Sequence, residues 1–375
     1  MWKISLFIME IRQYIKEKKE LYSNIIDFLE NESDDDDDDH FFDYIKSKNI
    51  NDDKNEFELF LLLISRISVN HFINRNISNK IEKILSYFKD PIKQTFSNSE
   101  IFNIFIKDKR TLLYLVNERI ITIDGSILQI ILDTKHQKMQ FCSFFYPEIK
   151  NMEGNDTFYF PFEENFDLKK FENNRKIGQN DSYICELIRN DSVEEFIQYV
   201  NKTNYSLESK IERSFYETNY FLIKNEPSLI EYAAFFGSIQ IFNYLRYSKV
   251  DLNPSLWIYS IHSSNPDLIH LLEENDVEPP KNEKISFRKC LKESIKCHHN
   301  NIFIYINDNL MVSNNHTKIQ KYCYRFYNYQ FLTDDLNETL FPHLCKYQFF
   351  NLVKFFLKNN EIKSLENIIL IFSYF

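Results

Sequence analysis

The stretch SLIEYAAFFGSIQIFNYL, residues 228–245, decides the fold, because a second stretch of the same pattern, SLWIYSIHSSNPDLIHLL, begins at residue 255. Both stretches follow a proline, open with Ser-Leu, carry a small or polar break near the middle and close with an apolar run. Pro227 and Pro254 suit the position just before a helix, where a missing N–H has no helical partner. Gly237 can adopt the left-handed conformation that ends a helix. Each stretch therefore predicts two short helices joined by a tight turn.

Weaker copies of this helix–turn–helix pattern recur along the second half of the chain. They are residues 183–200, 289–306 and 339–357. Other units lack the glycine and place Asp191, Ser264 with Asn265, and His298 with His299 at the turn. Asn and Asp tolerate the left-handed region better than most residues do, so tight turns are feasible without glycine.

These units resemble ankyrin repeats. SLIEYAA stands in the place of that family's TPLHxAA, and GSIQIFNYL in the place of its G-x-x-E-I-V-K-L-L. RKIGQNDSYICELIRNDSVEEFIQYVNKTNYSLESKIERSFYETN (175–219) and CLKESIKCHHNNIF (290–303) are more specifically similar to ankyrin-repeat proteins of trichomonad protists. In those proteins the stretches form a domain of unknown function at the start of a longer ankyrin array. The resemblance implies degenerate ankyrin repeats and carries over no catalytic residue.

Three segments are expected along this all-α chain. Residues 1–135 show helical apolar spacing and predict a bundle of short helices, interrupted by an acidic loop at 31–40 whose adjacent carboxylates repel one another. Residues 136–180, with FCSFFYPEIK and FYFPFEENF, predict an aromatic-rich connector. Residues 181–375 hold the degenerate repeats, which form a helix–turn–helix solenoid. Their final run, SLENIILIFSYF, is apolar where a terminal repeat needs a polar face, so we expect an array that continues in a longer parent protein.

Composition and charge exclude several classes of function. Of the 375 residues, 43% are hydrophobic and 16% aromatic, which is enough for a large buried core. The four glycines are scattered, so neither a phosphate-binding loop nor a dinucleotide fingerprint is present. The net charge is −10, and Glu30, Glu32 and the six aspartates of residues 34–39 contribute −8 of it. The rest of the chain therefore offers no basic field for nucleic acid.

The cysteines and the apolar runs indicate the compartment. The six cysteines form no CxxC pair and lie in apolar runs, which is typical of reduced thiols inside cells. The N-terminal apolar run is too short for a signal peptide, and the longest apolar segment, LFLLLI at 59–64, is far shorter than a bilayer span. We therefore expect an intracellular, cytoplasmic protein without a membrane span.

One cluster contains zinc-ligand residue types but favours a structural interpretation. Cys290 and Cys297 share a face of one predicted helix, whereas His298 and His299 point elsewhere, so the four cannot converge tetrahedrally. The two histidines fit an exposed turn that replaces the glycine. We therefore expect no metal at this position.

Two further patterns are also better explained by packing. Cys345 with His343 has the residue types of a nucleophile pair, but Cys345 takes the place of a small core alanine, where a thiolate is disfavoured. The run KYCYRFYNYQF, 321–331, mixes aromatics with two cations, as single-stranded nucleic acid sites do. Its aromatics fall at helical spacing, which favours a core role, and two cations are few for a phosphate track. We therefore expect no nucleic acid partner.

The connectors between the units are the expected contact surface. Lys249, Asp251 and Asn253 lie in one connector, and Asp276 and Glu278 lie in the next. Packing rarely needs charges at such tips, and in solenoids the tips and the inner helices form the binding surface. The leading hypothesis is a non-catalytic scaffold or adaptor that binds a protein partner and needs no cofactor. The alternative is an enzyme whose site lies in the N-terminal bundle.

Overall fold

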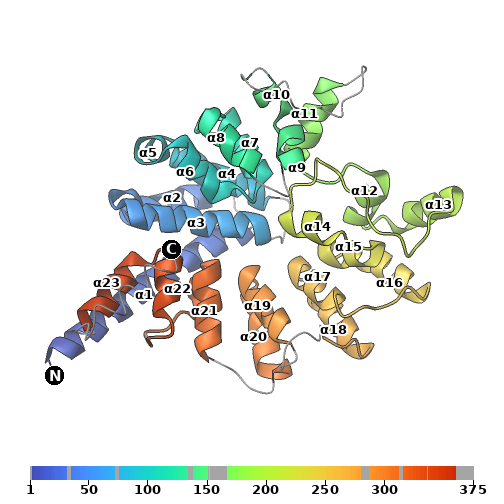
Figure 1. The fold of residues 1–375 in the computed structure, drawn as a ribbon. Helices are drawn as coiled ribbons and strands as arrows, with labels where there is room; N and C mark the ends of the chain where they lie inside the picture. The colour runs from blue at the N-terminus through green and yellow to red at the C-terminus, as the bar shows by residue number, and fades with distance from the viewer. Residues whose placement is uncertain are drawn as a thin grey trace. The chain divides into compact units, whose positions relative to one another are not determined.

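The computed structural model describes residues 2–31, 35–71, 76–133, 138–150, 152, 167–279, 287–311, 316–335 and 337–359. Helices dominate these ranges, and no strand occurs among them, which confirms the all-α fold class (Figure 1). The chain forms two compact units. Unit 1 contains residues 1–67 and 282–375, and unit 2 contains residues 68–281. The aromatic run at 158–166 and the apolar run at 364–375 lie outside the described residues.

Unit 1 takes its helices from the two ends of the chain. They are α1 (Trp2–Glu30), α2 (Asp35–Ser47), η1 (Ile50–Asp52), α3 (Lys54–Asn70), α19 (Arg288–Lys296), α20 (Asn300–Tyr305), η3 (Ile306–Leu310), α21 (His316–Phe326), η4 (Tyr329–Phe331), α22 (Phe341–Lys346) and α23 (Phe350–Asn359). The last residues of α3 belong to unit 2.

The core of unit 1 joins these two ends. Helix α1 packs against η4 and α23. The Tyr22 hydroxyl lies 3.1 Å from Nδ1 of His298. On α3, Glu56 accepts hydrogen bonds from the Tyr14 hydroxyl at 3.0 Å and from Asn351 Nδ2 at 2.5 Å. The described side chains of α1 therefore share a core with the C-terminal helices, because the apolar stripe of an amphipathic helix must be buried against other helices.

Unit 2 contains the middle of the chain. Its helices are α4 (Ile77–Tyr87), α5 (Lys89–Thr95), α6 (Asn98–Phe105), α7 (Lys109–Asn117), α8 (Gly125–Asp133), α9 (Lys138–Phe144), α10 (Tyr146–Ile149), α11 (Leu168–Ile177), α12 (Tyr183–Arg189), α13 (Val193–Thr203), α14 (Tyr220–Asn225), α15 (Leu229–Phe236), α16 (Ile239–Tyr247), α17 (Leu256–Ser263) and α18 (Pro266–Glu274). Helix α15 packs against α12, α16 and α17, and α13 packs against α16.

The quoted stretch at 228–245 begins and ends its first helix with local signals. Ser228 and Glu231 form a reciprocal capping box at the start of α15. Ala233 and Ala234 are completely buried, so the small side chains allow neighbouring helices to approach. Gly237 ends α15 with φ 71°. The Ser238 N–H donates to the Ala233 carbonyl at 2.9 Å and the Gly237 N–H to the Ala234 carbonyl at 3.3 Å. These two bonds define a Schellman turn.

The same turn closes the first helix of other pairs without glycine. Asp191, His298 and Gln348 adopt φ values of 51°, 59° and 63°, and the residue after each donates five residues back, as Ser238 does. Ser264 also lies in the left-handed region, with φ 53°. The predicted turn positions at 191, 264 and 298 are confirmed, because a tight turn between two helices commonly places a left-handed residue at the end of the first helix.

Several expectations differ from the structure. Residues 35–40 were expected in a loop, but they begin α2, because acidic residues are stabilised at a helix N-terminus and Phe41 and Ile45 bury the next turn. The expected connector at 136–180 contains α9, α10 and α11. The two units also divide the chain at places other than the expected segment boundaries, since both ends of the chain lie in unit 1. The three segments stay a prediction from sequence pattern.

Candidate binding site in unit 2

The five connector residues predicted to bind a partner are all exposed. Lys249, Asp251 and Asn253 follow α16, and Asp276 and Glu278 follow α18. Lys249 and Asp276 adopt left-handed φ values of 65° and 51°. Each of them ends its helix with the same pair of backbone hydrogen bonds as the turns inside the helix pairs. The backbone at these positions therefore has a structural role, while the charged side chains face solvent.

A buried valine fixes each connector. Val250 and Val277 follow the left-handed residues and are 6% and 8% exposed. The Trp257 indole N–H donates to the Val277 carbonyl at 2.7 Å. Trp257 is 1% exposed and therefore belongs to the core. The valines hold the connector backbone in place, and the charged residues on either side of them project from a fixed frame.

A second polar centre lies inside unit 2 and was not predicted. Glu217 is 6% exposed and lies in the segment between α13 and α14. Its carboxylate accepts from the backbone N–H of Asn219 at 2.8 Å and of Asn180 at 3.3 Å. Burial raises the pKa of the Glu217 carboxyl, and these N–H groups oppose the shift together with the charges of Arg189 and Lys109.

Lys109 is the buried cation of this centre. The residue is 4% exposed, and its Nζ donates to the Phe215 carbonyl at 3.3 Å. The same atom lies 5.0 Å from the centroid of the Phe144 ring. Burial lowers the pKa of Lys109 to about 8, and the nearby Glu217 opposes this shift. Lys109 therefore loses part of its charge at a mildly alkaline pH.

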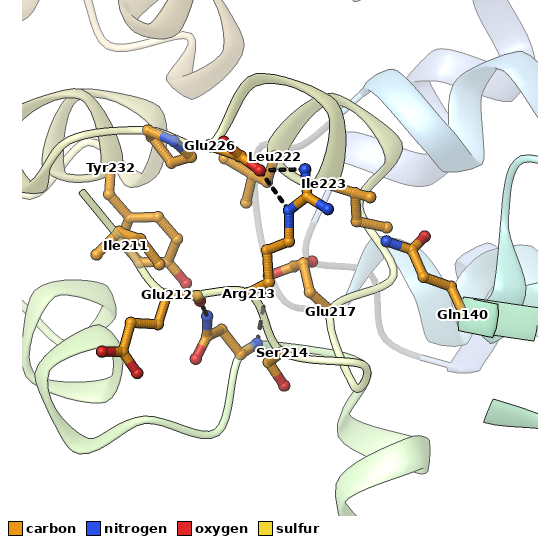
Figure 2. A pocket seen from close by; sticks show the side chains of 12 residues that line it. Gln140, Ile211, Glu212, Arg213, Ser214, Glu217, Leu222, Ile223, Glu226 and Tyr232 are labelled. Atoms are coloured by element: carbon orange, nitrogen blue, oxygen red, sulfur yellow. Dashed lines mark hydrogen bonds and ion pairs between the residues drawn. The ribbon is translucent and has the colours of Figure 1, made fainter. Parts of the chain in front are cut away.

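Beside Glu217 lies a small pocket of about 30 Å³ (Figure 2). The exposed Arg213 and the half-buried Glu226 form an ion pair among its lining residues. The buried Tyr232 also lines it, and its hydroxyl accepts a hydrogen bond from Nη1 of Arg189 at 2.8 Å. A pocket of this size is large enough for water but too small for an organic ligand.

A larger groove of about 620 Å³ lies where α4, α7, α11 and α12 approach one another. Its lining includes the cations Arg110, Lys170 and Arg189 and the carboxylates Asp181 and Glu186. The groove and the pocket share one lining residue, Asn180, whose side-chain amide donates to the Glu212 carbonyl at 2.8 Å. The volume is that of a site for a small molecule.

The cysteine and histidine cluster of the sequence is buried in unit 1. Cys290 and Cys297 are completely buried, and burial raises the pKa of Cys290 to about 12, so both sulfurs are held as thiols. His298 and His299 were expected in an exposed turn. They do form the turn, but they are 1% and 3% exposed, because Tyr22 of α1 packs on His298 with ring centroids 5.7 Å apart.

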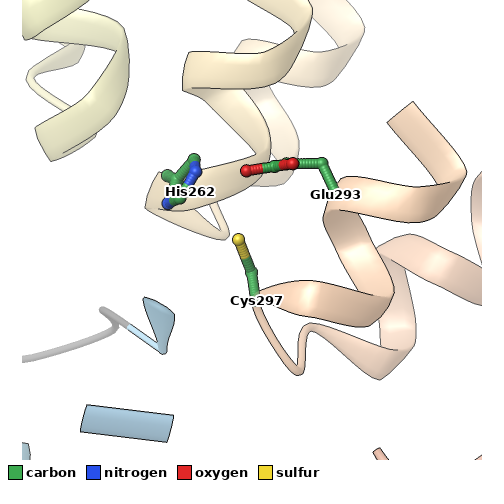
Figure 3. Close-up of side chains that lie close together, drawn as sticks. All are labelled: His262, Glu293 and Cys297. Carbon is green, nitrogen blue, oxygen red and sulfur yellow. The ribbon is translucent and has the colours of Figure 1, made fainter. Parts of the chain in front are cut away.

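Figure 3 shows Glu293 on α19, Cys297 at the end of α19 and His262 on α17. Glu293 and Cys297 belong to unit 1, whereas His262 belongs to unit 2. A zinc site uses three or four protein ligands. Unit 1 supplies only two of these residues and unit 2 only one, so neither unit by itself holds enough ligands. His262 instead packs in unit 2 between the rings of Phe221 and Phe235, with centroids 4.1 and 5.1 Å away.

The two other patterns of the sequence analysis lie largely in the core. Cys345 is 9% exposed, and burial raises the pKa of its thiol. Burial also lowers the pKa of His343. In the aromatic run at 321–331, Phe326 and Tyr329 are buried. These positions therefore agree with the core interpretation.

The alternative hypothesis, an enzyme site in residues 1–135, would require a cavity lined by a carboxyl group of raised pKa. Burial raises the pKa of Glu82 on α4, and the nearby Arg110 opposes this shift. Arg110 lines the groove, but Glu82 does not. The two features therefore do not coincide in one site, and the alternative stays a prediction.

Comparison of the sequence with models of known protein families, with curated proteins and with solved structures found no match. Within the described ranges, no helix has both the length and the apolar character that crossing a bilayer requires.

Proposed function

We propose that this chain is a non-catalytic binding protein whose helix pairs act as degenerate ankyrin-type repeats, with the connectors after α16 and α18 contacting a protein partner. The supporting observation is the recurrence of one pattern in both connectors: a charged left-handed residue, a buried valine and an exposed acid. Lys249 and Asp276 are 27 residues apart, the same separation as Ser228 and Ser255, which open the two pairs. The exposed charges thus recur once per pair.

The residue types at the left-handed positions of the two connectors are not the ones that the backbone favours most. Glycine would satisfy a left-handed backbone better than Lys or Asp does. The valine needs burial, but the flanking charges make no contribution to the core. A row of charges on a fixed frame is what an extended protein contact uses for orientation and association rate. The six cysteines are buried and form no disulfide, which supports action in a reducing intracellular compartment, the cytoplasm.

The test compares two charge-reversed full-length proteins. The connector variant carries Asp251→Lys with Glu278→Lys. The control carries Glu172→Lys with Glu208→Lys, which are exposed positions of unit 2 outside the connectors and the groove. Each protein is used to capture partners from a lysate of the source cell, and each captured protein is then purified and titrated against all three forms.

We expect a purified partner that binds the wild type and the control equally and the connector variant at least tenfold more weakly, which is about 1.4 kcal/mol. If every specific partner binds the connector variant as tightly as the wild type, the connectors are not the contact surface and the proposal is wrong.

A further inference from the structure

The groove of about 620 Å³ in unit 2 has an unusual lining for a structural gap between helices. Of the residues that line it, Ile177 is the only one with an apolar side chain, and it is 54% exposed. Gaps between packed helices are normally filled by apolar side chains at high density. A groove of this volume lies in the range of roughly 300–1,000 Å³ that small-molecule sites occupy.

Three cations from three different helices line the groove. Arg110 comes from α7, Lys170 from α11 and Arg189 from α12. Arg189 uses Nη1 for the Tyr232 hydroxyl at 2.8 Å, which engages one of the five donors of a guanidinium. The charge of Arg189 also lowers the pKa of the buried Glu217, so the two side chains attract one another.

Arg110 has donors that the described part of the chain does not satisfy. Its Nε is buried and has no hydrogen-bond partner there. Its Cδ lies 3.4 Å from the point where a Cβ on Gly178 would sit, so the stem is held against the start of the segment leading to α12. A buried donor without a partner carries a free-energy cost, which a small movement of the guanidinium toward a ligand oxygen in the groove would remove.

The rest of the lining suits hydroxyl groups. Asp181 and Glu186 are exposed carboxylates, which accept hydrogens. Ser78, Asn79 and Gln179 add side chains that both donate and accept. Two carboxylates near three cations would repel a ligand with many negative charges, such as a nucleic acid strand. They favour instead a ligand with one anionic group and several hydroxyls.

We propose that this groove binds a small polyhydroxylated molecule that carries one phosphate or carboxylate group. The cations on α7, α11 and α12 hold the anionic group, since guanidinium pairs with planar or tetrahedral oxyanions through several donors at once. The amide and carboxylate side chains bind the hydroxyls. An apolar ligand would displace water from these cations without offering them an acceptor. This site is independent of the connectors and of their partner.

The experiment is a binding titration of the full-length protein with a defined set of probes. The set contains hexose phosphates, pentose phosphates and aldonic acids, with the matching neutral sugars and inorganic phosphate as separate arms. Ligand-observed NMR finds the best probe, and calorimetry then measures its affinity. The phosphate and aldonate arms distinguish the two sources of the anionic group.

Arg110→Gln removes the guanidinium whose Nε has no hydrogen-bond partner in the described part of the chain. Lys170→Gln removes the charge of an exposed lysine, so it should not disturb folding. Arg213→Gln is the control, because Arg213 is an exposed arginine of unit 2 that does not line the groove. We expect one probe to saturate the wild type and the control, and to bind both groove variants at least tenfold more weakly.

Three outcomes would overturn the proposal. In the first, no probe binds the wild type at millimolar concentration. In the second, both groove variants bind the best probe as tightly as the control does. In the third, inorganic phosphate binds as tightly as the best sugar phosphate, which would mean that the hydroxyls are not recognised.

Discussion

Lys109 shows what burial does to a single side chain in unit 2. Its Nζ lies over the Phe144 ring and donates to the Phe215 carbonyl, and the charge of Glu217 is nearby. Removing a charge from water disfavours the ionised form, and one nearby carboxylate does not fully compensate for this effect. At this scale the protein therefore holds a cation whose charge depends on pH near neutrality.

The stability of the protein should reflect this shift. The pKa of Lys109 is lowered from an ordinary value of 10.5 to about 8, so between these pH values the unfolded chain binds more protons than the folded one. The contribution of Lys109 to the free energy of unfolding therefore rises with pH across this window, by roughly 3 kcal/mol at 1.4 kcal/mol per pKa unit. Urea unfolding of the wild type and of Lys109→Met, below pH 8 and near pH 10.5, measures it.

The wild type should gain stability relative to Lys109→Met as the pH rises. The matched control is Lys170→Met, which removes an exposed lysine and should leave the pH dependence unchanged. If the free energies of unfolding of the wild type and Lys109→Met differ by the same amount at both pH values, burial does not lower the pKa of Lys109.

The repeated element of this fold is the left-handed turn that ends a short helix. The turns at 191, 237, 264, 298 and 348 use five different residue types, of which only one is glycine. L-residues other than glycine carry a free-energy cost in this conformation, which is lower for Asn and Asp. Replacing the non-glycine residue at such a turn by glycine should therefore raise the free energy of unfolding. Replacing Gly237 by another residue should lower it.

Two single changes at equivalent turns test this argument in opposite directions. Gly237→Ala should lower the free energy of unfolding by about 1 kcal/mol, and Ser264→Gly should raise it by about 1 kcal/mol. The alanine Cβ at 237 would meet its nearest neighbours at 3.5 Å or more, so the effect comes from the backbone alone. Chemical unfolding at one pH gives both values. Stabilisation by Gly237→Ala would show that the backbone at 237 does not need its left-handed conformation.

At the scale of the whole molecule, chain order and packing order differ. Unit 1 combines residues 1–67 with residues 282–375, while unit 2 is continuous from 68 to 281. Helix α1 contributes Ile11, Ile15 and Tyr22 to the buried residues of unit 1. A compact unit with its own core can fold by itself, and one that lacks a core helix cannot.

Two fragments should therefore behave differently. Residues 68–281 should fold alone and unfold in one cooperative transition, because they contain a complete unit. Residues 181–375 should not, although they hold every predicted repeat, because they lack α1 and leave both compact units incomplete. Circular dichroism during heating and limited proteolysis compare the two. A cooperative transition in the second fragment would favour the segment boundaries predicted from sequence over the two compact units.

The sequence by itself determined the features that depend on neighbouring residues. Apolar spacing and the positions of prolines and glycine predicted the helix pairs and the turns at Asp191, Ser264 and His298. The exposure of the five connector residues could also be predicted, because charges at helix ends are rarely buried.

Only the tertiary structure decided which distant segments meet. It buried His298 under Tyr22 of α1, enclosed Lys109 with groups from two other segments, and placed Arg110, Lys170 and Arg189 along one groove. No local pattern distinguishes Lys109 from an exposed lysine, since its burial depends on residues far along the chain. Helix periodicity specifies which face is apolar but not which partner covers it, and that choice belongs to the packing of the whole core.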